Sequence, residues 1–242
     1  MRPRFAVFAL MIISVLCLVR AAAPASSSDK ERMKPVRPDM EKIASEVSDP
    51  RSPYYYPKLM AKYEANETIM GLEDYRHLYL GYVFQEDFNP YRHSEFARQV
   101  EEQYYKTNHT RAECDTIIKY AELSLADNPF DLRQINFLIY ALREKQKNNL
   151  ANIWQYRLNH LLEAIVSTGT GLDKDNAWYV INPQHEYTII NLLGHVAQKQ
   201  NFEAPYYDYI AVEKKKDNDP AGYYFNIRHI LEEYLRKYPD SE

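Results

Sequence analysis

Seven histidines raise the question of whether any group of them could hold a metal ion. His185 and Glu186 begin as the HExxH zinc motif does, but Ile189 stands where its second histidine belongs. His195 follows on the same predicted helix, about 15 Å farther along the axis, which is too far for it to share an ion with His185. The other histidines are scattered along the chain. We therefore expect no metal and no other cofactor.

Residues that could act as nucleophiles are also poorly placed. Cys114 falls on the apolar face of a predicted helix, where a thiol behaves as a small hydrophobic side chain. No serine occupies the GxSxG motif of hydrolases. The Gly169-Thr170-Gly171 segment lacks both the third glycine and the lysine of a phosphate-binding loop. These patterns favour a protein that is not an enzyme and name no catalytic residue.

Four residues, Trp178, Tyr179, His185 and Glu186, could together line a ligand site. His185 and Glu186 lie in the first turn of a predicted helix, close to the end of a predicted strand that carries Trp178 and Tyr179. An imidazole and a carboxyl group there could serve as acid and base in a hydrolase. Alternatively, Glu186 complements the helix dipole and His185 is a packing or surface residue.

Tyrosine is unusually abundant, with 22 copies against 9 phenylalanines. Phenol rings are favoured where one end of a side chain is buried and the other meets water, as at binding surfaces. Many of these tyrosines share helical stripes with leucine, which predicts packing. Others occur as adjacent pairs, which cannot both face one core, so we expect some to meet solvent or a partner. The pairs are Tyr54–Tyr55, Tyr104–Tyr105, Tyr206–Tyr207 and Tyr223–Tyr224.

Helical periodicity runs from Ser52 to Ser167 and predicts six helices of about 13 to 18 residues. Short connections require neighbouring helices to pack antiparallel, which predicts a stack of α-α hairpins resembling tetratricopeptide architecture. The tetratricopeptide sequence register itself is not met, because Tyr105 falls at the position of its glycine when Pro129 is set at its last proline. The predicted breaks are Asn66–Gly71, Asn89–Pro90, Asn108, Asn128–Pro129 and Asn148–Asn149.

The composition changes after Ser167, where we expect a small antiparallel sheet of three strands. The predicted strands are 177–181, 207–213 and 223–227, with one helix from Asn182 to about Asn201 and a last helix to Tyr238. The predicted fold is mainly α with this α+β part, and residues 52–238 form a single domain divided into 52–167 and 168–238.

The first 23 residues have the pattern of an export signal. Arg2 and Arg4 precede an apolar run over 5–19, and alanines 21–23 suit a signal peptidase. About 15 apolar residues are fewer than a membrane span needs, so we expect no transmembrane anchor after cleavage. Residues 24–51 follow as a flexible leader with a short helix. This pattern predicts a protein of the periplasm or the cell surface.

Charge and cysteine content exclude two classes of protein. Removal of Arg2, Arg4 and Arg20 with the signal leaves 27 basic residues against 34 acidic ones, a formal charge of −7 that disfavours nucleic acid as a partner. Cys17 lies within the signal, so Cys114 alone remains and no disulfide framework can form.

Several segments between Tyr54 and Leu235 resemble a family of exported bacterial proteins, catalogued as a domain of unknown function and common among Gram-negative gut anaerobes. The resemblance implies export from a Gram-negative bacterium and a mainly helical fold, and it supplies no catalytic residues. The matching segments are YYYPKLMAKYEAN, LEDYRHLYLGYVFQEDFNPYR, GTGLDKDNAWYVINPQHEYTIINLLG, YDYIAV and YYFNIRHILEEYL.

Three functions follow as hypotheses. The first is a non-catalytic binding module that offers a tyrosine-bearing surface to an envelope protein, a peptide or a glycan. The second is a hydrolase with a site near Trp178, His185 and Glu186. The third is a structural or chaperone-like factor of the envelope.

Overall fold

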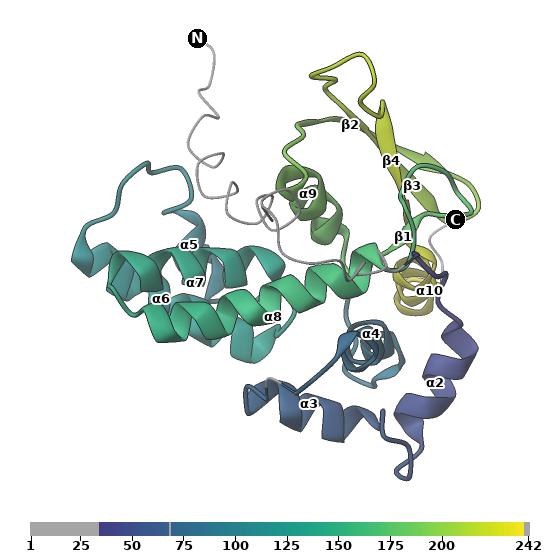
Figure 1. Ribbon diagram of the computed structural model, residues 1–242, viewed down its shortest axis with the longest axis horizontal. Helices are drawn as coiled ribbons and strands as arrows, with labels where there is room; N and C mark the ends of the chain where they lie inside the picture. The colour runs from purple at the N-terminus through teal and green to yellow at the C-terminus, as the bar shows by residue number, and fades with distance from the viewer. Residues whose placement is uncertain (1–33, 68, 240–242) are drawn as a thin grey trace, which may run out of the picture.

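The computed structural model describes residues 34–67 and 69–239, so the predicted signal segment lies outside the described residues. The described residues form nine α-helices, a 3-10 helix and a four-stranded sheet (Figure 1). The helices are α2 (Met40–Ser48), α3 (Tyr56–Glu64), α4 (Leu72–Gly81), η1 (Tyr82–Phe84), α5 (Ala97–Glu101), α6 (Arg111–Asp127), α7 (Leu132–Glu144), α8 (Asn148–Val166), α9 (Pro183–Leu192) and α10 (Arg228–Lys237). The strands are β1 (Trp178–Tyr179), β2 (Ala197–Glu203), β3 (Tyr207–Val212) and β4 (Gly222–Asn226).

Polar side chains cap the starts of the central helices, just after the predicted breaks at Asn108 and Asn128–Pro129. Thr110 and Glu113 form a reciprocal capping box at the start of α6, and Asp131 accepts from the main-chain N–H groups of Arg133 and Gln134 at the start of α7. The predicted start at Ser52 was wrong, because that side chain closes a turn and α3 begins later, at Tyr56. The helices α6 and α7 have 17 and 13 residues, within the predicted range, whereas α3, α4 and α5 have only 9, 10 and 5.

The helices α6, α7 and α8 pack in sequence order, as short connections require. The helix α4 instead packs across α8, and α2 packs on α4 (Figure 1). The side-by-side stack thus consists of α6, α7 and α8 with the short α5 against α6, and residues 85–96, which are outside helices, separate it from α4 along the chain. The hydrophobic core is continuous through both groups and includes the fully buried Tyr79, Phe130 and Leu138.

The prediction of three antiparallel strands was wrong. The sheet has four strands in the order β1-β4-β3-β2, and it is mixed because β1 pairs parallel to β4 while the other pairs are antiparallel. The missed strand, β2, lies at the edge of the sheet, where its exposed Gln198, Lys199 and Gln200 side chains give no apolar pattern.

The same error made the predicted helix after Asn182 too long. Asn182 caps α9 with its side chain as expected, but the helix ends at Leu192. Gly194 then adopts φ +78°, and the main-chain N–H of His195 donates to the carbonyl of Ile190, which is a typical glycine-terminated helix end. His185 and His195 therefore do not share one helix.

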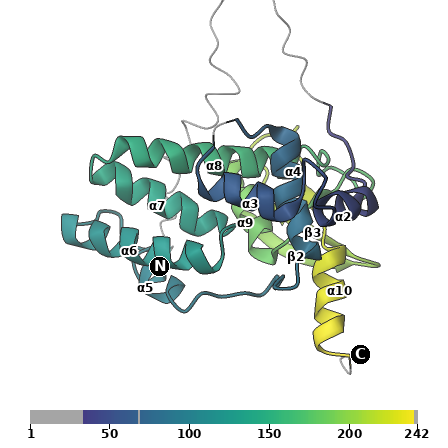
Figure 2. The same cartoon turned by 90° about the horizontal axis from the view of Figure 1, so that it is seen from below.

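The two faces of the sheet carry different side chains, because neighbours along a strand point to opposite sides. Cross-strand pairing places Trp178, Phe225 and Asp208 on the face that α9 covers, which we call the α9 face. Tyr179 and its pairing neighbours Asn226 and Tyr207 lie on the opposite side, which we call the outer face. The last helix, α10, leaves the end of β4 and extends away from the body (Figure 2).

Candidate functional site

The four residues of the predicted site are all buried, but the structure does not bring them together. Trp178 and Tyr179 are adjacent in β1, so they point to opposite faces of the sheet. His185 and Glu186 are adjacent in α9, where successive side chains diverge by about 100°. Each of the four consequently has its own surroundings.

Trp178 packs inside the domain. Its ring stacks on Tyr223 with centroids 5.1 Å apart, and its indole N–H donates to the carbonyl of Gly169 at 3.0 Å. Gly171 approaches the same ring so closely that a β-carbon there would lie 2.7 Å from it, and its φ of +70° also favours glycine. The glycine-led segment therefore provides the space that the Trp178 ring occupies and a carbonyl that accepts from it.

His185 is held in the interior by hydrogen bonds. Its Nδ1 lies 2.7 Å from the hydroxyl of Tyr79, which also accepts from the main-chain N–H of Ile181 at 3.3 Å. The Tyr79 hydroxyl thus donates to Nδ1. Burial lowers the pKa of His185 to about 4, although a hydrogen bond with the main chain of Phe130 acts in the opposite direction. His185 is therefore neutral at physiological pH. Its hydrogen bonds go to Tyr79 and Phe130, on the side of α9 that faces the helices.

Glu186 points to the sheet, where it meets Asp208 of β3. Neither oxygen of Glu186 accepts a hydrogen bond from any described residue, and the side chain is fully buried. Burial, reinforced by the charge of Asp208, raises its pKa well above the ordinary value. Its surroundings therefore favour the protonated form, in which the carboxyl group can donate to Asp208.

Tyr179 contributes to a pocket of about 190 Å³ on the outer face. The Nε of Arg37 donates to its hydroxyl at 3.0 Å. Apolar side chains of α2 and η1, Met40, Ala44 and Phe84, form one side of this pocket. The remaining residues that line it are Glu41, Tyr206, Asn226, Arg228 and His229.

Two arginines from opposite ends of the described chain converge on this pocket. Arg228, at the start of α10, uses its Nε to pair with Glu232 at 2.7 Å and lies over the ring of Tyr206 at 5.7 Å. The hydrogen bond of Arg37 likewise involves only its Nε. Within residues 34–67 and 69–239, no acceptor binds the terminal nitrogens of either guanidinium group. Both forks are thus available to an anion.

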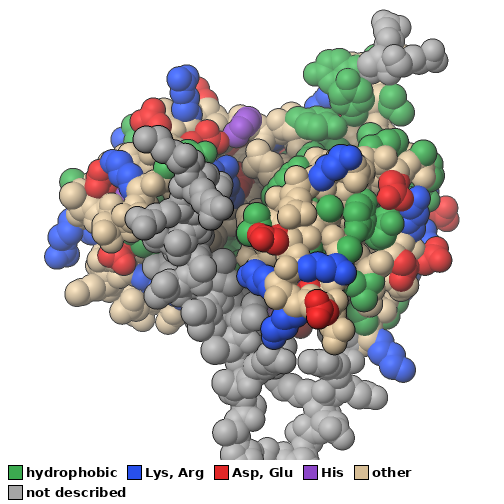
Figure 3. Space-filling model, turned by 90° about the horizontal axis from the view of Figure 1, so that it is seen from above, with side chains coloured by type: hydrophobic (Ala, Val, Ile, Leu, Met, Phe, Trp, Pro, Cys, Tyr) green, Lys and Arg blue, Asp and Glu red, His purple; other side chains and the backbone are tan. Residues whose placement is uncertain are grey.

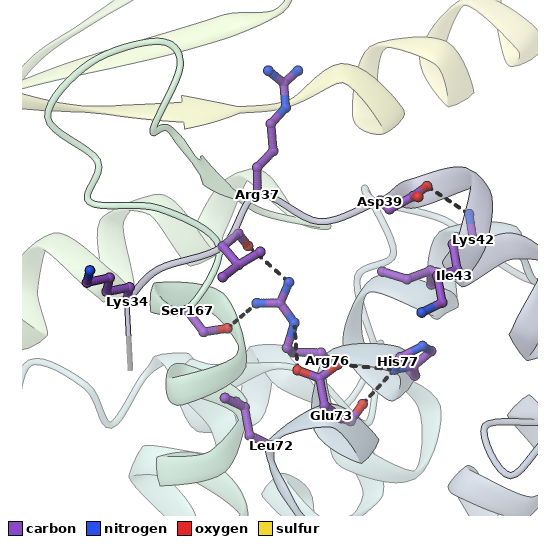
Figure 4. A pocket seen from close by; sticks show the side chains of 11 residues that line it. Lys34, Arg37, Asp39, Lys42, Ile43, Leu72, Glu73, Arg76, His77 and Ser167 are labelled. Carbon is purple, nitrogen blue, oxygen red and sulfur yellow. Dashed lines mark hydrogen bonds and ion pairs between the residues drawn. The ribbon is translucent and has the colours of Figure 1, made fainter. Parts of the chain in front are cut away.

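A second, larger pocket of about 260 Å³ lies beside the same N-terminal segment, but its central arginine is already occupied. Figure 4 shows Arg76 donating to Ser167 at 2.5 Å and to the main-chain oxygen of Val36 at 3.1 Å, while Nε faces Glu73. Arg37 points away from this cluster (Figure 4). The hydrogen bonds of Arg76 in the larger pocket therefore hold residues 34–39 in place and so position Arg37 at the smaller pocket.

Other kinds of site find little support in the part of the chain that the structure describes. It contains no group of three or more histidine, cysteine or acidic side chains able to hold a metal ion. None of its helices has both the length and the apolar character that crossing a bilayer requires.

Residues 41–236 match the family described as a domain of unknown function, DUF4919. The chain belongs to this family. No curated protein and no solved structure matches the chain. The resemblance to a family of unknown function is thus confirmed, whereas a Gram-negative origin, export and tetratricopeptide-like architecture stay predictions.

Arg37 and Arg228 are the pocket residues that sequence reasoning missed. Arg37 lies between Pro35 and Pro38 in a segment that reads as a flexible leader. Arg228 reads as an ordinary basic residue of an amphipathic helix. The available signal was the proline spacing, which fits an extended segment laid on a surface as well as it fits a free leader.

Proposed function

We propose that this protein is a non-catalytic binding module that captures the C-terminal carboxylate of a peptide at the outer-face pocket. The observation that carries the proposal is the pair of open guanidinium forks of Arg37 and Arg228 in one pocket with two tyrosines. Arginine forks match carboxylates in geometry and in charge. The peptide interpretation is favoured over a glycan because Met40, Ala44 and Phe84 offer an apolar wall for a terminal side chain.

The size and polarity of the pocket support a terminal group as the ligand. At about 190 Å³ it is smaller than the usual sites for whole drug-sized ligands. Asn226 is buried beside the two arginines, and its Oδ1 accepts from the main-chain N–H of Arg228. Its amide group is thereby oriented where it could donate to a second ligand oxygen. If the apolar run over 5–19 directs export, the peptide would belong to an envelope protein.

The hydrolase alternative has weaker support. Catalysis by an imidazole and a carboxylate requires both groups to reach one substrate. His185 is hydrogen-bonded to Tyr79 on the side of α9 that faces the helices, whereas Glu186 lies against Asp208 on the side that faces the sheet. No observation favours a chaperone-like role over binding at the pocket.

Fluorescence anisotropy with labelled peptides that end in leucine or phenylalanine tests this proposal. We expect the free-acid peptides to bind at least about tenfold more tightly than their C-terminal amides, because the amide removes the charge. Arg37→Gln and Arg228→Gln should each weaken binding of the acid by a similar factor. Arg51→Gln is the matched control, since Arg51 is an exposed arginine that pairs with Asp49 away from the pocket. Equal binding of acid and amide, or no binding of either, would refute the proposal.

A further inference from the structure

A second polar site lies on the α9 face, where Glu186 and Asp208 bring two carboxyl groups together. Asp208 is 5% exposed and Glu186 is fully buried. Because no described N–H or O–H donates to Glu186, an ionised carboxylate there would be unsatisfied, whereas a protonated one can donate to Asp208. Burial also raises the pKa of Asp208, but hydrogen bonds with Gln200 and Glu186 oppose that shift, so the negative charge of the pair centres on Asp208 and not on Glu186.

That charge is not neutralised by a nearby cation. Asp208 accepts from Nε2 of Gln200 at 2.5 Å, and the hydroxyl of Tyr187 donates to Oε1 of the same glutamine at 2.6 Å. These partners are neutral. Among the described residues, no lysine or arginine acts on the pKa of either carboxyl group. In its ionised form a carboxylate without a countercharge would be stabilised by a cationic ligand beside it.

Exposed aromatic side chains lie near this carboxylate. Phe202 pairs with Asp208 across the strands, which places its 56% exposed side chain on the same face. Tyr187 comes from α9. Burial raises the pKa of its phenol group, and the nearby Glu186 and Asp208 raise it further. Tyr91, from the segment between η1 and α5, is also within reach of the Asp208 charge, and its ring meets Tyr234 of α10 edge-on at 6.1 Å.

The rim thus draws rings from four separate segments of the chain. Tyr91, Tyr187 and Tyr234 are 46%, 41% and 37% exposed, so each keeps ring surface that a ligand can reach. Figure 3 shows hydrophobic side chains, a class that includes tyrosine, over the sheet half of the molecule and out to the last turns of α10. The buried acid pair thus lies beneath a surface that carries several exposed aromatic rings.

We infer that this site binds an organic ammonium group, with Asp208 as its counterion and the rim tyrosines and Phe202 against its methyl or methylene groups. Aromatic faces attract organic cations, and a carboxylate at the base of such a cage adds direct charge pairing. A neutral sugar could stack on the same rings but would not use the uncompensated charge. The ammonium site and the carboxylate pocket occupy opposite faces of the sheet, so the inference does not depend on the proposed function.

Isothermal titration calorimetry of the full chain with choline and with ethanolamine, at matched ionic strength, tests the inference. We expect saturable binding of at least one of these probes and none of glucose. Asp208→Asn should weaken that binding at least about tenfold, because it removes the charge. Glu186→Gln should leave it nearly unchanged, since a carboxamide also donates to Asp208 and is neutral like the protonated acid.

A variant on the exposed rim keeps the test valid if Asp208→Asn does not fold. Tyr234→Ala alters a side chain at the surface of α10 and should weaken ammonium binding roughly fivefold. Circular dichroism verifies the fold of each variant, and peptide binding at Arg37 should be unaffected by all of them. The inference is overturned if neither amine binds, if Asp208→Asn binds as the parent protein does, or if glucose binds equally well.

Discussion

The two faces of the C-terminal sheet carry similar aromatic side chains beside opposite charges. On the outer face, Tyr179 and Tyr206 lie with Arg37 and Arg228. On the α9 face, Tyr187 lies near Asp208, whose charge no described lysine or arginine offsets. The phenol rings are common to both sites, and the charged residues distinguish them.

The difference between the faces arises from alternation along single strands. Tyr207 and Asp208 are neighbours, yet their pairing partners Asn226 and Phe225 place them on opposite sides. The charges then come from distant segments, such as the N-terminal segment held by Arg76. A tyrosine in this chain therefore acquires its chemistry from what the fold places next to it.

The largest expected effect comes from removing the phenylalanine ring of Phe225, which is buried on the α9 face. Phe225→Ala should lower the free energy of unfolding by about 4 kcal/mol, because the side chain is fully buried and its loss leaves a cavity. Tyr224→Ala, one residue away on the outer face, should cost about 1 kcal/mol, chiefly its stacking on Tyr209. Urea denaturation of both variants measures the contrast. Equal losses would mean that the two faces are equally buried.

Acid should destabilise the protein through His185. Its pKa is about 4 in the folded protein, below the ordinary value of 6.5, so the unfolded chain takes up a proton first as the pH falls. The contribution is complete above pH 6.5 and is lost as the pH falls towards 4, amounting to about 3 kcal/mol. Urea denaturation across this range should show that loss in the parent protein and a smaller one in His185→Gln.

Glu186 supplies the internal control for that measurement, because its pKa is shifted in the opposite direction. A raised pKa in the folded protein means that stability falls as the pH rises above the ordinary value of 4.5. Glu186→Gln should remove this fall and leave the acid loss from His185 in place. Identical pH profiles for the two variants would contradict the assignment of both groups.

The smallest expected effect is the difference between Arg76, which holds the N-terminal segment, and Arg37, which lines the outer-face pocket. Arg76→Gln should lower the free energy of unfolding by about 2 kcal/mol, because it removes charged hydrogen bonds to Ser167 and Val36. Arg37→Gln should cost about 0.3 kcal/mol, as expected for an exposed side chain. Thermal unfolding compares the two. A larger loss at Arg37 would indicate a structural role and weaken the proposal that its fork serves a ligand.

Local signals predicted much of the helical part. Thr110, Asp131 and Asn182 begin helices where their side chains can cap them, because capping depends on residues within one turn. The apolar patterns of β3 and β4 were also sufficient to place those strands. The strand β2 was not predicted because it is an edge strand that is held by main-chain pairing with β3 and has no apolar pattern of its own.

The candidate sites could not be predicted in the same way. Glu186 was identified as unusual, but its partner Asp208 lies in another element and becomes close only through the packing of α9 on the sheet. Arg37 and Arg228 are 191 positions apart in the chain. No local pattern records such a pairing.

The sequence by itself determined the helix starts at Thr110, Asp131 and Asn182, the strands with apolar alternation and the supply of tyrosines, because each depends on side chains within a few residues. Tertiary structure alone decided which tyrosines meet arginines and which meet carboxyl groups. The physical reason is that charge acts over the short distances set by packing, and packing joins segments from opposite ends of the chain.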